Sequence, residues 1–226
     1  MDIYKSYIAS FAKEKESFIS EIEQFADENY VPIMDSGGID MFISLLRIQK
    51  PERILEIGSA IGYSAIRIAA ALPRASIVTI ERDNERFMKA VDYISRSGYS
   101  ERIAIIEADA LLTDSMDIFD KEYDALFIDA AKGQYKRFFE RYAPVVAAGG
   151  VIYCDNMFMH GMVLHEDKDV PKRNRTMIRN LKEFTKWIMS NPEFEASLLP
   201  VGDGLLIAVK KKEKISLAIS MFYRIF

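Results

Sequence analysis

The stretch RILEIGSAIGYS, residues 53–64, decides the fold of this chain. Residues 54–57 form a short apolar run around one acid, which is typical of a parallel strand buried on both faces. Gly58 ends the run and lets the backbone turn close to a ligand, because glycine has no Cβ. Gly62 and Ser64 begin an apolar helix whose free backbone N–H groups would face whatever the turn holds. The stretch therefore predicts a strand, a ligand-binding turn and a helix in succession.

The spacing of the glycines limits which kind of ligand the turn is expected to bind. A dinucleotide-binding turn would follow G-x-G-x-x-G, but Ala60 stands where the second glycine would be. The remaining pattern is E-x-G-x-x-x-G, from Glu56 to Gly62, and the next predicted strand, 76–80, leads into the acidic Glu81. A merely tight turn is the alternative, and the acid after the second strand favours a nucleoside cofactor over it.

Beyond this stretch the chain alternates between strand-like and helix-like segments. Strands are predicted at 53–57, 76–80, 102–107, 123–128 and 149–154, and helices at 63–72, 84–97, 111–119 and 134–143. This alternation indicates a parallel sheet with right-handed crossovers and helices on both faces. A basic helix is predicted at 172–190, and strands at 194–199 and 205–210 flank the Asp-Gly turn of residues 201–204. We therefore predict an α/β fold with a mostly parallel seven-stranded sheet that ends in an antiparallel hairpin.

Residues 1–50 precede the first strand of the sheet. Residues 4–28 place apolar side chains at helical spacing and predict one or two amphipathic helices, which would pack on the core or contact a dimer partner. Pro32 and the glycine pair at 37–38 are expected to loosen the connection before a second helix at 39–48. That connection would be either a lid over the cofactor or an ordinary link between helices.

Residues 1–212 are predicted to form one domain, because no linker or repeat divides them. The tail at 213–226 carries apolar residues at helical spacing and would either pack on the domain or a partner, or form a poorly ordered end. We expect a cytoplasmic protein without membrane contact, since no apolar run could span a membrane and no secretory signal core is present.

The composition of the 226 residues excludes several kinds of site. The single cysteine, Cys154, rules out an internal disulfide, and only two histidines argue against a zinc cluster. The net charge of −4 gives no global attraction to nucleic acid, although a local basic patch would still bind phosphates.

Acidic residues follow five successive predicted strands. They are Glu56, Glu81, Asp109, Asp129 and Asp155, the last followed by Asn156. A lone aspartate at a strand end is more often a helix N-cap. However, ligands of parallel sheets bind beyond the carboxyl ends of the strands, where all five acids would converge. The convergence favours a functional site.

Three of these residues are candidate metal ligands. Asp129, Asp155 and Asn156 offer oxygen donors at the ends of adjacent strands, which suits Mg²⁺, with Ca²⁺ or Mn²⁺ as alternatives. A cation held there would lower the pKa of a bound hydroxyl. Lys132, three residues past Asp129, is a candidate base for the hydroxyl proton; the alternative is an ordinary solvated lysine.

These motifs together resemble a known family. The E-x-G-x-x-x-G turn followed by Glu81 is similar to the first motif of class I S-adenosylmethionine (SAM) methyltransferases. With the segment DAAK at 129–132 and Asp155-Asn156, it resembles the cation-dependent O-methyltransferases, the group that contains catechol and caffeoyl-CoA methyltransferases. The resemblance implies a Rossmann-like class I methyltransferase fold, a metal on Asp129, Asp155 and Asn156, Lys132 as the catalytic base, and a homodimer.

The same resemblance implies a set of cofactor contacts. Glu81 and Asp109 with Ala110 would hold the ribose and adenine of SAM, and Ser64 would lie near its methionine carboxylate. The full set is Met34, Glu56, Gly58, Ala60, Gly62, Tyr63, Ser64, Glu81, Asp109, Ala110 and Asp129.

Further motifs resemble one bacterial branch, the tRNA 5-hydroxyuridine methyltransferases, which make 5-methoxyuridine at the wobble position. They are VPIM at 31–34, AIGYSAIR at 60–67, DAAKGQY at 129–135 and VGDGL at 201–205. One departure is His160, where the branch often has lysine, and this concerns substrate contacts. The tail at 213–226 also extends past the usual end of the family.

A basic stretch fits this branch. Six cations lie within the fifteen residues 168–182, with Asp169 as the only acid up to Lys182. The predicted tRNA contacts are Lys172, Arg173, Arg175 and Arg179. A solvated helix face is the alternative interpretation, and the resemblance favours a phosphate-binding patch over it.

The sequence thus predicts a SAM- and Mg²⁺-dependent O-methyltransferase that acts on 5-hydroxyuridine in tRNA. The first alternative keeps the chemistry and changes the acceptor to a small catechol-like or caffeoyl-CoA-like phenol. The second alternative is a non-catalytic RNA-binding protein on a vestigial cofactor fold, against which the intact acids at 56, 81 and 129 argue.

Overall fold

The computed structural model describes residues 7, 10–11 and 15–212. The predicted C-terminal tail, 213–226, lies outside the described residues, as do Tyr4 and Ile8 of the predicted N-terminal helix. Within residues 4–28 the structure contains α2 (Ser17–Glu28). No helix among the described residues is long and apolar enough to cross a membrane.

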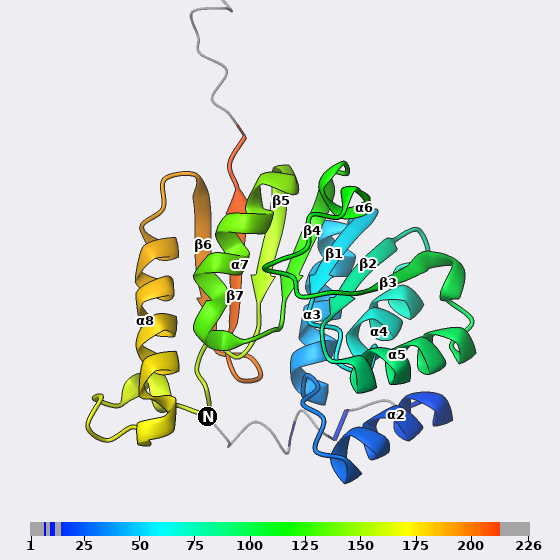
Figure 1. Cartoon of the computed structure of the whole chain (residues 1–226), viewed down its shortest axis with the longest axis horizontal. Helices are drawn as coiled ribbons and strands as arrows, with labels where there is room; N and C mark the ends of the chain where they lie inside the picture. The colour runs from blue at the N-terminus through cyan, green and yellow to red at the C-terminus, as the bar shows by residue number, and fades with distance from the viewer. Residues whose placement is uncertain (1–6, 8–9, 12–14, 213–226) are drawn as a thin grey trace, which may run out of the picture.

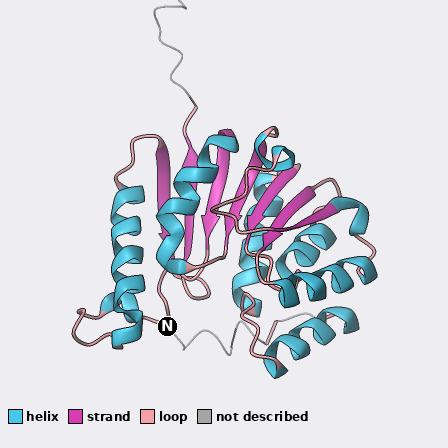
Figure 2. Ribbon diagram, viewed as in Figure 1, coloured by secondary structure: helices cyan, strands magenta, loops and turns pink. Residues whose placement is uncertain are grey.

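A single sheet of seven strands forms the centre of the protein (Figures 1 and 2). Its order is β3-β2-β1-β4-β5-β7-β6, with parallel pairing from β3 to β5 and antiparallel pairing of β7 to both β5 and β6. The strands are β1 (Arg53–Ile57), β2 (Ser76–Glu81), β3 (Ile103–Glu107), β4 (Tyr123–Ile128), β5 (Val146–Cys154), β6 (Phe194–Leu199) and β7 (Leu205–Lys210). The predicted fold class is confirmed, including the C-terminal hairpin.

Two apolar clusters cover the two faces of the sheet. Along β1, Ile54 joins one cluster while Leu55 and Ile57 join the other, as the alternation of side chains along a strand requires. The first cluster holds residues of α2, α3 (Ser36–Gln49), α4 (Tyr63–Ala71) and α5 (Asn84–Arg96); the second holds residues of α6 (Met116–Phe119), α7 (Tyr135–Tyr142) and α8 (Arg175–Met189). Short 3-10 turns connect these elements: η1 (Ser100–Arg102), η2 (Lys132–Gln134), η3 (Ala143–Val145), η4 (Met162–Leu164) and η5 (Lys172–Asn174).

Two predicted helices differ from the structure. The segment at 37–38 is not loose, because Asp35 caps α3 by accepting the N–H groups of Gly37 and Gly38, each at 3.0 Å, so the helix begins at Ser36. The helix predicted at 111–119 is wrong over most of its length, and only α6 forms. Asp109 competes with helix formation there by accepting the Leu111 N–H at 2.8 Å on its side chain.

β1 and β4 are neighbours at the centre of the sheet. From β1 the chain adds β2 and β3 on one side, and from β4 it adds β5 on the other side, so the strand order switches direction between β1 and β4. In open parallel sheets this switch point leaves a crevice beyond the carboxyl ends of the two strands. The turn after β1 and the segment after β4 therefore bound the place where a ligand is expected.

Candidate active site at the carboxyl ends of β1, β4 and β5

The turn after β1 is held tightly against β2 and β4. Gly58 and Ser59 donate their N–H groups to the Ile80 carbonyl at 2.9 and 3.2 Å. Gly58 has φ +96°, and a Cβ on it would overlap the carbonyl oxygen of Asp129 and lie 2.8 Å from the carbonyl carbon. Gly62 follows with φ +82° at the start of α4. Glycine is therefore required where the cofactor-side turn meets the strand that carries the first predicted metal ligand.

Glu81 is tied to this turn by its carboxylate. It accepts the N–H groups of Ala60 at 2.8 Å and of Arg82 and Asp83 at 2.9 Å each, and only 7% of the residue is exposed. The three backbone N–H groups satisfy this nearly buried carboxylate. Glu81 thus fixes the shape of the turn, and its contact with a ribose stays a prediction.

Glu56 lies beneath the same turn and is completely buried. Its two oxygens accept the hydroxyl groups of Ser64 and, at 2.5 Å, Thr79. Burial raises the pKa of Glu56 to about 7, helped by the charges of Asp129 and Glu81 and opposed by the two hydroxyl groups. Direct contact of Glu56 or Ser64 with a cofactor would require these hydrogen bonds to be shared or broken, and such contact stays a prediction.

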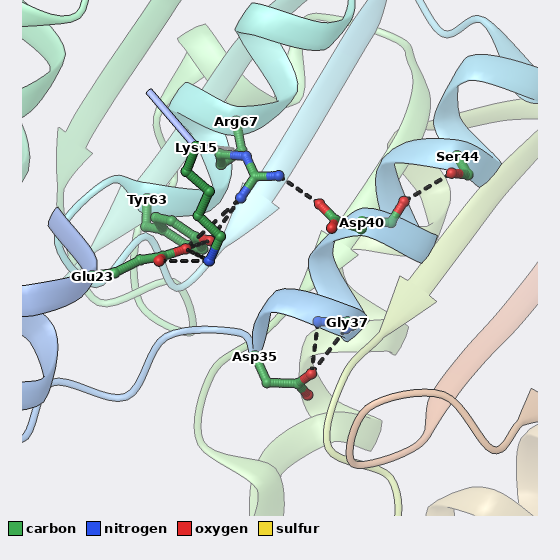
Figure 3. A network of polar contacts seen from close by, with 9 residues as sticks. Lys15, Glu23, Asp35, Gly37, Asp40, Ser44, Tyr63 and Arg67 are labelled. Carbon is green, nitrogen blue, oxygen red and sulfur yellow. Dashed lines mark hydrogen bonds and ion pairs between the residues drawn. The ribbon is translucent and has the colours of Figure 1, made fainter. Parts of the chain in front are cut away.

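Tyr63 has a structural role that the sequence did not indicate (Figure 3). Its hydroxyl donates to Glu23 of α2 at 2.6 Å and accepts from Arg67 at 2.8 Å. Arg67 also binds Asp40 of α3 at 2.6 Å, and Lys15 pairs with Glu23 at 2.6 Å. This network joins α2 and α3 to α4, so the Tyr63 side chain anchors the N-terminal helices beside the cofactor turn.

The adenine side of the predicted site lies at the ends of β2 and β3. Asp109 is partly exposed, and one of its oxygens lies 3.9 Å from the Arg82 guanidinium. Ala110 is 7% exposed and is held by the Tyr142 hydroxyl, which donates to its carbonyl at 2.6 Å. Met34 is buried in the apolar cluster beside α3. The contacts of these three residues with a cofactor remain predictions.

The acceptor side is formed by the residues after β4 and β5. Asp129 donates its N–H to Ile57 at 2.9 Å, and Asp155 donates its N–H to Ile128 at 3.2 Å, so both acids lie on the edge that the turn borders. Lys132 forms an ion pair with Asp129. The predicted base thus pairs with Asp129 of its own loop, and Asp155 reaches the same edge from the loop after β5.

The donor set fits a divalent cation. Asp155 is 2% exposed, and its burial and the neighbouring Asp129 charge raise its pKa to about 7, opposed by the Asn156 N–H and by Lys132. Two close carboxylates with one ammonium group as the positive charge are a favourable environment for a second cation. In the described part of the chain no three His, Cys, Asp or Glu side chains gather as a metal site; the third donor expected here is the amide of Asn156.

Asn156 itself has a left-handed backbone, with φ +55°. Asparagine tolerates this conformation better than most residues. The turn after β5 thus directs the chain away from the sheet immediately after Asp155.

Two residues near the site were not singled out by the sequence. The buried Tyr135 hydroxyl donates to the Asp155 carbonyl at 2.9 Å, and burial raises the pKa of this phenol well above its usual value. Asp203, in the hairpin turn, accepts the His160 N–H at 2.6 Å. Tyr135 lies in the DAAKGQY motif and Asp203 in VGDGL, so both were visible as motif members without an assigned role.

The basic residues of the predicted patch divide into two groups. Arg175 donates to the carbonyls of Val170 at 2.9 Å and Lys168 at 3.0 Å, so its guanidinium holds the loop before α8. Lys172, Arg173 and Arg179 are exposed, and their side chains have no hydrogen bond or ion pair with other described residues. The exposed three are the available cations.

The basic segment formed by η5 and the start of α8 lies next to the predicted acceptor side. Asn180 donates to the Gly133 carbonyl at 3.0 Å, and a Cβ on Gly133 would lie 3.6 Å from the Cα of Met177. Gly133 directly follows Lys132. Arg179 is therefore carried by a helix that packs against the segment of the predicted base, and Lys172 and Arg173 by the η5 turn just before that helix.

Comparison with known proteins identifies the family of the chain. A family model described as O-methyltransferase matches residues 9–211. A caffeoyl-CoA O-methyltransferase of Populus kitakamiensis is 32% identical over 182 residues, covering 78% of this chain and 76% of the relative. A flavonoid 3',5'-methyltransferase of Vitis vinifera is 32% identical over 184 residues, covering 78% and 77%.

Solved structures show the same architecture. A Staphylococcus aureus crystal structure, provisionally assigned as a caffeoyl-CoA O-methyltransferase, has a TM-score of 0.86 at 33% identity and covers 92% of this chain and all of its own (100%). A Bacillus cereus O-methyltransferase in complex with SAH has a TM-score of 0.77 at 27% identity, covering 91% and 96%. The chain belongs to the O-methyltransferase family, and its fold is the Rossmann-like methyltransferase fold.

Proposed function

We propose that this protein is a SAM- and divalent-cation-dependent O-methyltransferase that methylates the 5-hydroxyl of 5-hydroxyuridine at the tRNA wobble position. The observation that carries the proposal is the meeting of Asp129, Asp155 and Lys132 beside the glycine turn, next to a helix with exposed cations. Membership of the O-methyltransferase family supports the reaction class.

SAM is the proposed methyl donor. The Bacillus cereus relative is bound to SAH, which supports a site for this cofactor at the equivalent edge of the sheet. The turn of residues 58–62 would pass beneath the methionine part, and Glu81 and Asp109 would accept hydrogen bonds from the nucleoside. Because the turn is already fixed by Glu81 and Ile80, SAM would bind a largely preformed surface.

Mg²⁺ is the proposed cation, with Mn²⁺ or Ca²⁺ as alternatives. Asp129, Asp155 and Asn156 would hold it, and the bound cation would draw electron density from the acceptor oxygen and lower the pKa of its hydroxyl. If Asp129 held a cation, Lys132 would no longer be tied to it as an ion pair, and its amine, after giving its own extra proton to solvent, would be the base for the hydroxyl proton.

The transfer itself needs no further group. Lys132 would accept the hydroxyl proton, and SAM would supply the methyl group, whose bond to sulfur would break as the C–O bond forms, so that neutral S-adenosylhomocysteine would remain. The contribution of the protein is to hold the oxygen, carbon and sulfur in line.

The exposed cations of η5 and α8 support a polyanionic substrate. Arg179 lies on α8, which packs against the Lys132 segment, and Lys172 and Arg173 lie in the η5 turn that precedes it, so the three would contact phosphates flanking a nucleotide placed in the site. A cytoplasmic tRNA is the proposed partner, and a homodimer is the proposed assembly.

Nucleoside mass spectrometry of tRNA, from cells with and without the protein, tests the substrate. We expect 5-methoxyuridine to disappear and 5-hydroxyuridine to accumulate when the protein is absent; unchanged 5-methoxyuridine would refute the tRNA proposal. In vitro, reversing the charge of Lys172, Arg173 and Arg179 should abolish transfer to tRNA. The matched control reverses the exposed Arg47, Arg74 and Lys121, which lie near the opposite ends of the strands, and should retain activity.

A second candidate acceptor is a small catechol-like or caffeoyl-CoA-like phenol. It is favoured by the relatives from Populus and Vitis, whose names give caffeoyl-CoA and a flavonoid as substrates. If this candidate is correct, reversing the charges of Lys172, Arg173 and Arg179 should leave methylation of a small catechol nearly unchanged, and the unaltered protein should not methylate tRNA.

A further inference from the structure

The loop after β5 has an unusual backbone. Asn156, Met159 and His160 have φ of +55°, +45° and +53°, and Gly161 follows at +83°. Residues other than glycine rarely adopt this region, and such conformations persist only where the surroundings hold them. The loop at 155–161 must therefore be fixed by contacts from elsewhere in the fold.

The turn between β6 and β7 supplies those contacts. Met157 donates its N–H to Gly204 at 2.9 Å, and Phe158 donates to the Asp203 carbonyl at 2.8 Å. A Cβ on Gly204 would lie 2.7 Å from the Phe158 ring and 3.0 Å from its backbone nitrogen. The hairpin turn and the loop are thus packed backbone to backbone.

One side chain of the turn extends this contact to the strained part of the loop. Oδ1 of Asp203 accepts the His160 N–H at 2.6 Å, at the second of the three consecutive left-handed residues. The Asp203 side chain is only 13% exposed, whereas the His160 side chain is 83% exposed. Oδ2 of Asp203 is buried without a hydrogen-bond partner among the described residues and lies 3.7 Å from Nδ1 of His160. The bond to the backbone, and not the exposed imidazole, is therefore the well-defined interaction.

The same turn also touches the start of α3. A Cβ on Gly202 would lie 2.9 Å from Oδ2 of Asp35 and 3.4 Å from the Cα of Gly38. Asp35 caps α3 and directly follows Met34 (Figure 3 shows Asp35 with Gly37). The hairpin turn thus lies between the start of α3 and the loop that carries Asn156.

We infer that Asp203 is a positioning residue: it holds the loop at 155–161 through the His160 N–H and so sets the place of Asn156 on the acceptor side of the site. Its link to methyl transfer rests on the proposed function, whereas its effect on the loop does not. Hydrogen bonds that orient ligating residues typically matter about 10- to 100-fold in activity or metal affinity.

Three variants test this inference. Asp203→Ala removes the acceptor; Asp203→Asn keeps an oxygen that can accept the His160 N–H. Asn191→Ala is the matched control, since Asn191 accepts the Glu193 N–H at 2.9 Å in the turn between α8 and β6, near the opposite end of the hairpin.

Hydrogen exchange of residues 156–161 is the readout that needs no substrate. Asp203→Ala should exchange these amides about tenfold faster or more, while Asp203→Asn and Asn191→Ala should resemble the unaltered protein. Exchange in Asp203→Ala equal to that of the unaltered protein would overturn the inference. If Asp203→Ala accelerates exchange throughout the sheet, the milder variant Asp203→Ser decides the question. Faster exchange confined to the loop in Asp203→Ser supports the inference, and no faster exchange in the loop overturns it.

Kinetics then test the link to the site. Asp203→Ala should lower kcat/KM for the acceptor about 10- to 100-fold and leave the Kd of SAM within about twofold, with recovery in Asp203→Asn. A loop that opens without loss of kcat/KM would overturn the positioning role. If the unaltered protein methylates neither acceptor class, the proposed function fails, and the exchange data alone still decide whether Asp203 holds the loop.

Discussion

Replacing Gly58 with alanine is expected to destabilise the protein and weaken SAM binding. The added Cβ would overlap the Asp129 carbonyl, with the carbonyl carbon at 2.8 Å, and φ at this residue is +96°. A left-handed alanine costs about 1–2 kcal/mol, of which the loss of chain entropy in the unfolded state offsets about 0.4–1 kcal/mol. Overpacking against backbone that cannot rotate away adds about 1–3 kcal/mol. The sum is a loss of about 1–5 kcal/mol in the free energy of unfolding.

Gly98→Ala provides the matched control. Gly98 also has positive φ, +76°, but a Cβ there meets nothing within 4 Å. Its replacement should cost about 1 kcal/mol or less, which is the backbone contribution alone.

Urea denaturation of both variants measures the difference, and calorimetry measures the Kd of SAM. A difference of 1 kcal/mol corresponds to about 2–4 °C in Tm for a chain of this size. If Gly58→Ala were no less stable than Gly98→Ala and bound SAM equally well, the argument that β4 closes against the cofactor turn would be refuted.

Three other predictions follow from the geometry. Removing divalent cations with a chelator, or introducing Asp129→Ala, should reduce methyl transfer by about 100-fold or more. Added Mg²⁺ should restore the activity of the unaltered protein and not that of Asp129→Ala. Full activity in either case would disprove cation dependence. Because burial raises the pKa of both Glu56 and Asp155 to about 7, the folded state holds protons that the unfolded state releases near pH 4. The free energy of unfolding without added cations should therefore fall from pH 5 to pH 7. Glu56→Gln should reduce this fall in denaturation curves, and an unchanged pH dependence of the free energy of unfolding would contradict the assignment. Arg67→Met should lower the free energy of unfolding by about 1–3 kcal/mol, because the bonds to Tyr63 and Asp40 are lost. The control Arg74→Met, in which the wild-type Arg74 side chain is 80% exposed, should cost less than about 0.5 kcal/mol. Equal effects of the two substitutions would count against the network as an anchor of α2 and α3.

Much of the fold could be predicted because it depends on local patterns. The strands at 123–128, 194–199 and 205–210 agree with β4, β6 and β7 at both ends, since apolar runs bounded by glycine, proline and acidic residues define them. The helix predicted at 111–119 failed for an equally local reason. Asp109 accepts the Leu111 N–H and so stabilises a turn that apolar periodicity does not reveal.

The sequence predicts where the candidate site lies in the fold, but it does not predict which partner each side chain of the site binds. Placement of Glu81, Asp109, Asp129 and Asp155 at one edge follows from parallel topology alone. Arg175 was grouped with the tRNA contacts because it lies in a basic stretch, yet its guanidinium is used by the carbonyls of Val170 and Lys168. A charge count along the chain does not tell a cation that faces solvent from one that holds a loop.

The sequence by itself determined the alternation of strands and helices, the glycine turn and the edge at which the acids converge, because each depends on neighbouring residues or on the regular geometry of parallel strands. Only the tertiary structure decided that Ser64 and Thr79 enclose Glu56, that Tyr63 joins Glu23 to Arg67, and that Asp203 holds the backbone of His160. Of these pairs, Thr79 and Glu56, Tyr63 and Glu23, and Asp203 and His160 are separated by 23, 40 and 43 residues. Their meeting depends on strand register and on how the N-terminal helices and the hairpin pack, which no local periodicity encodes.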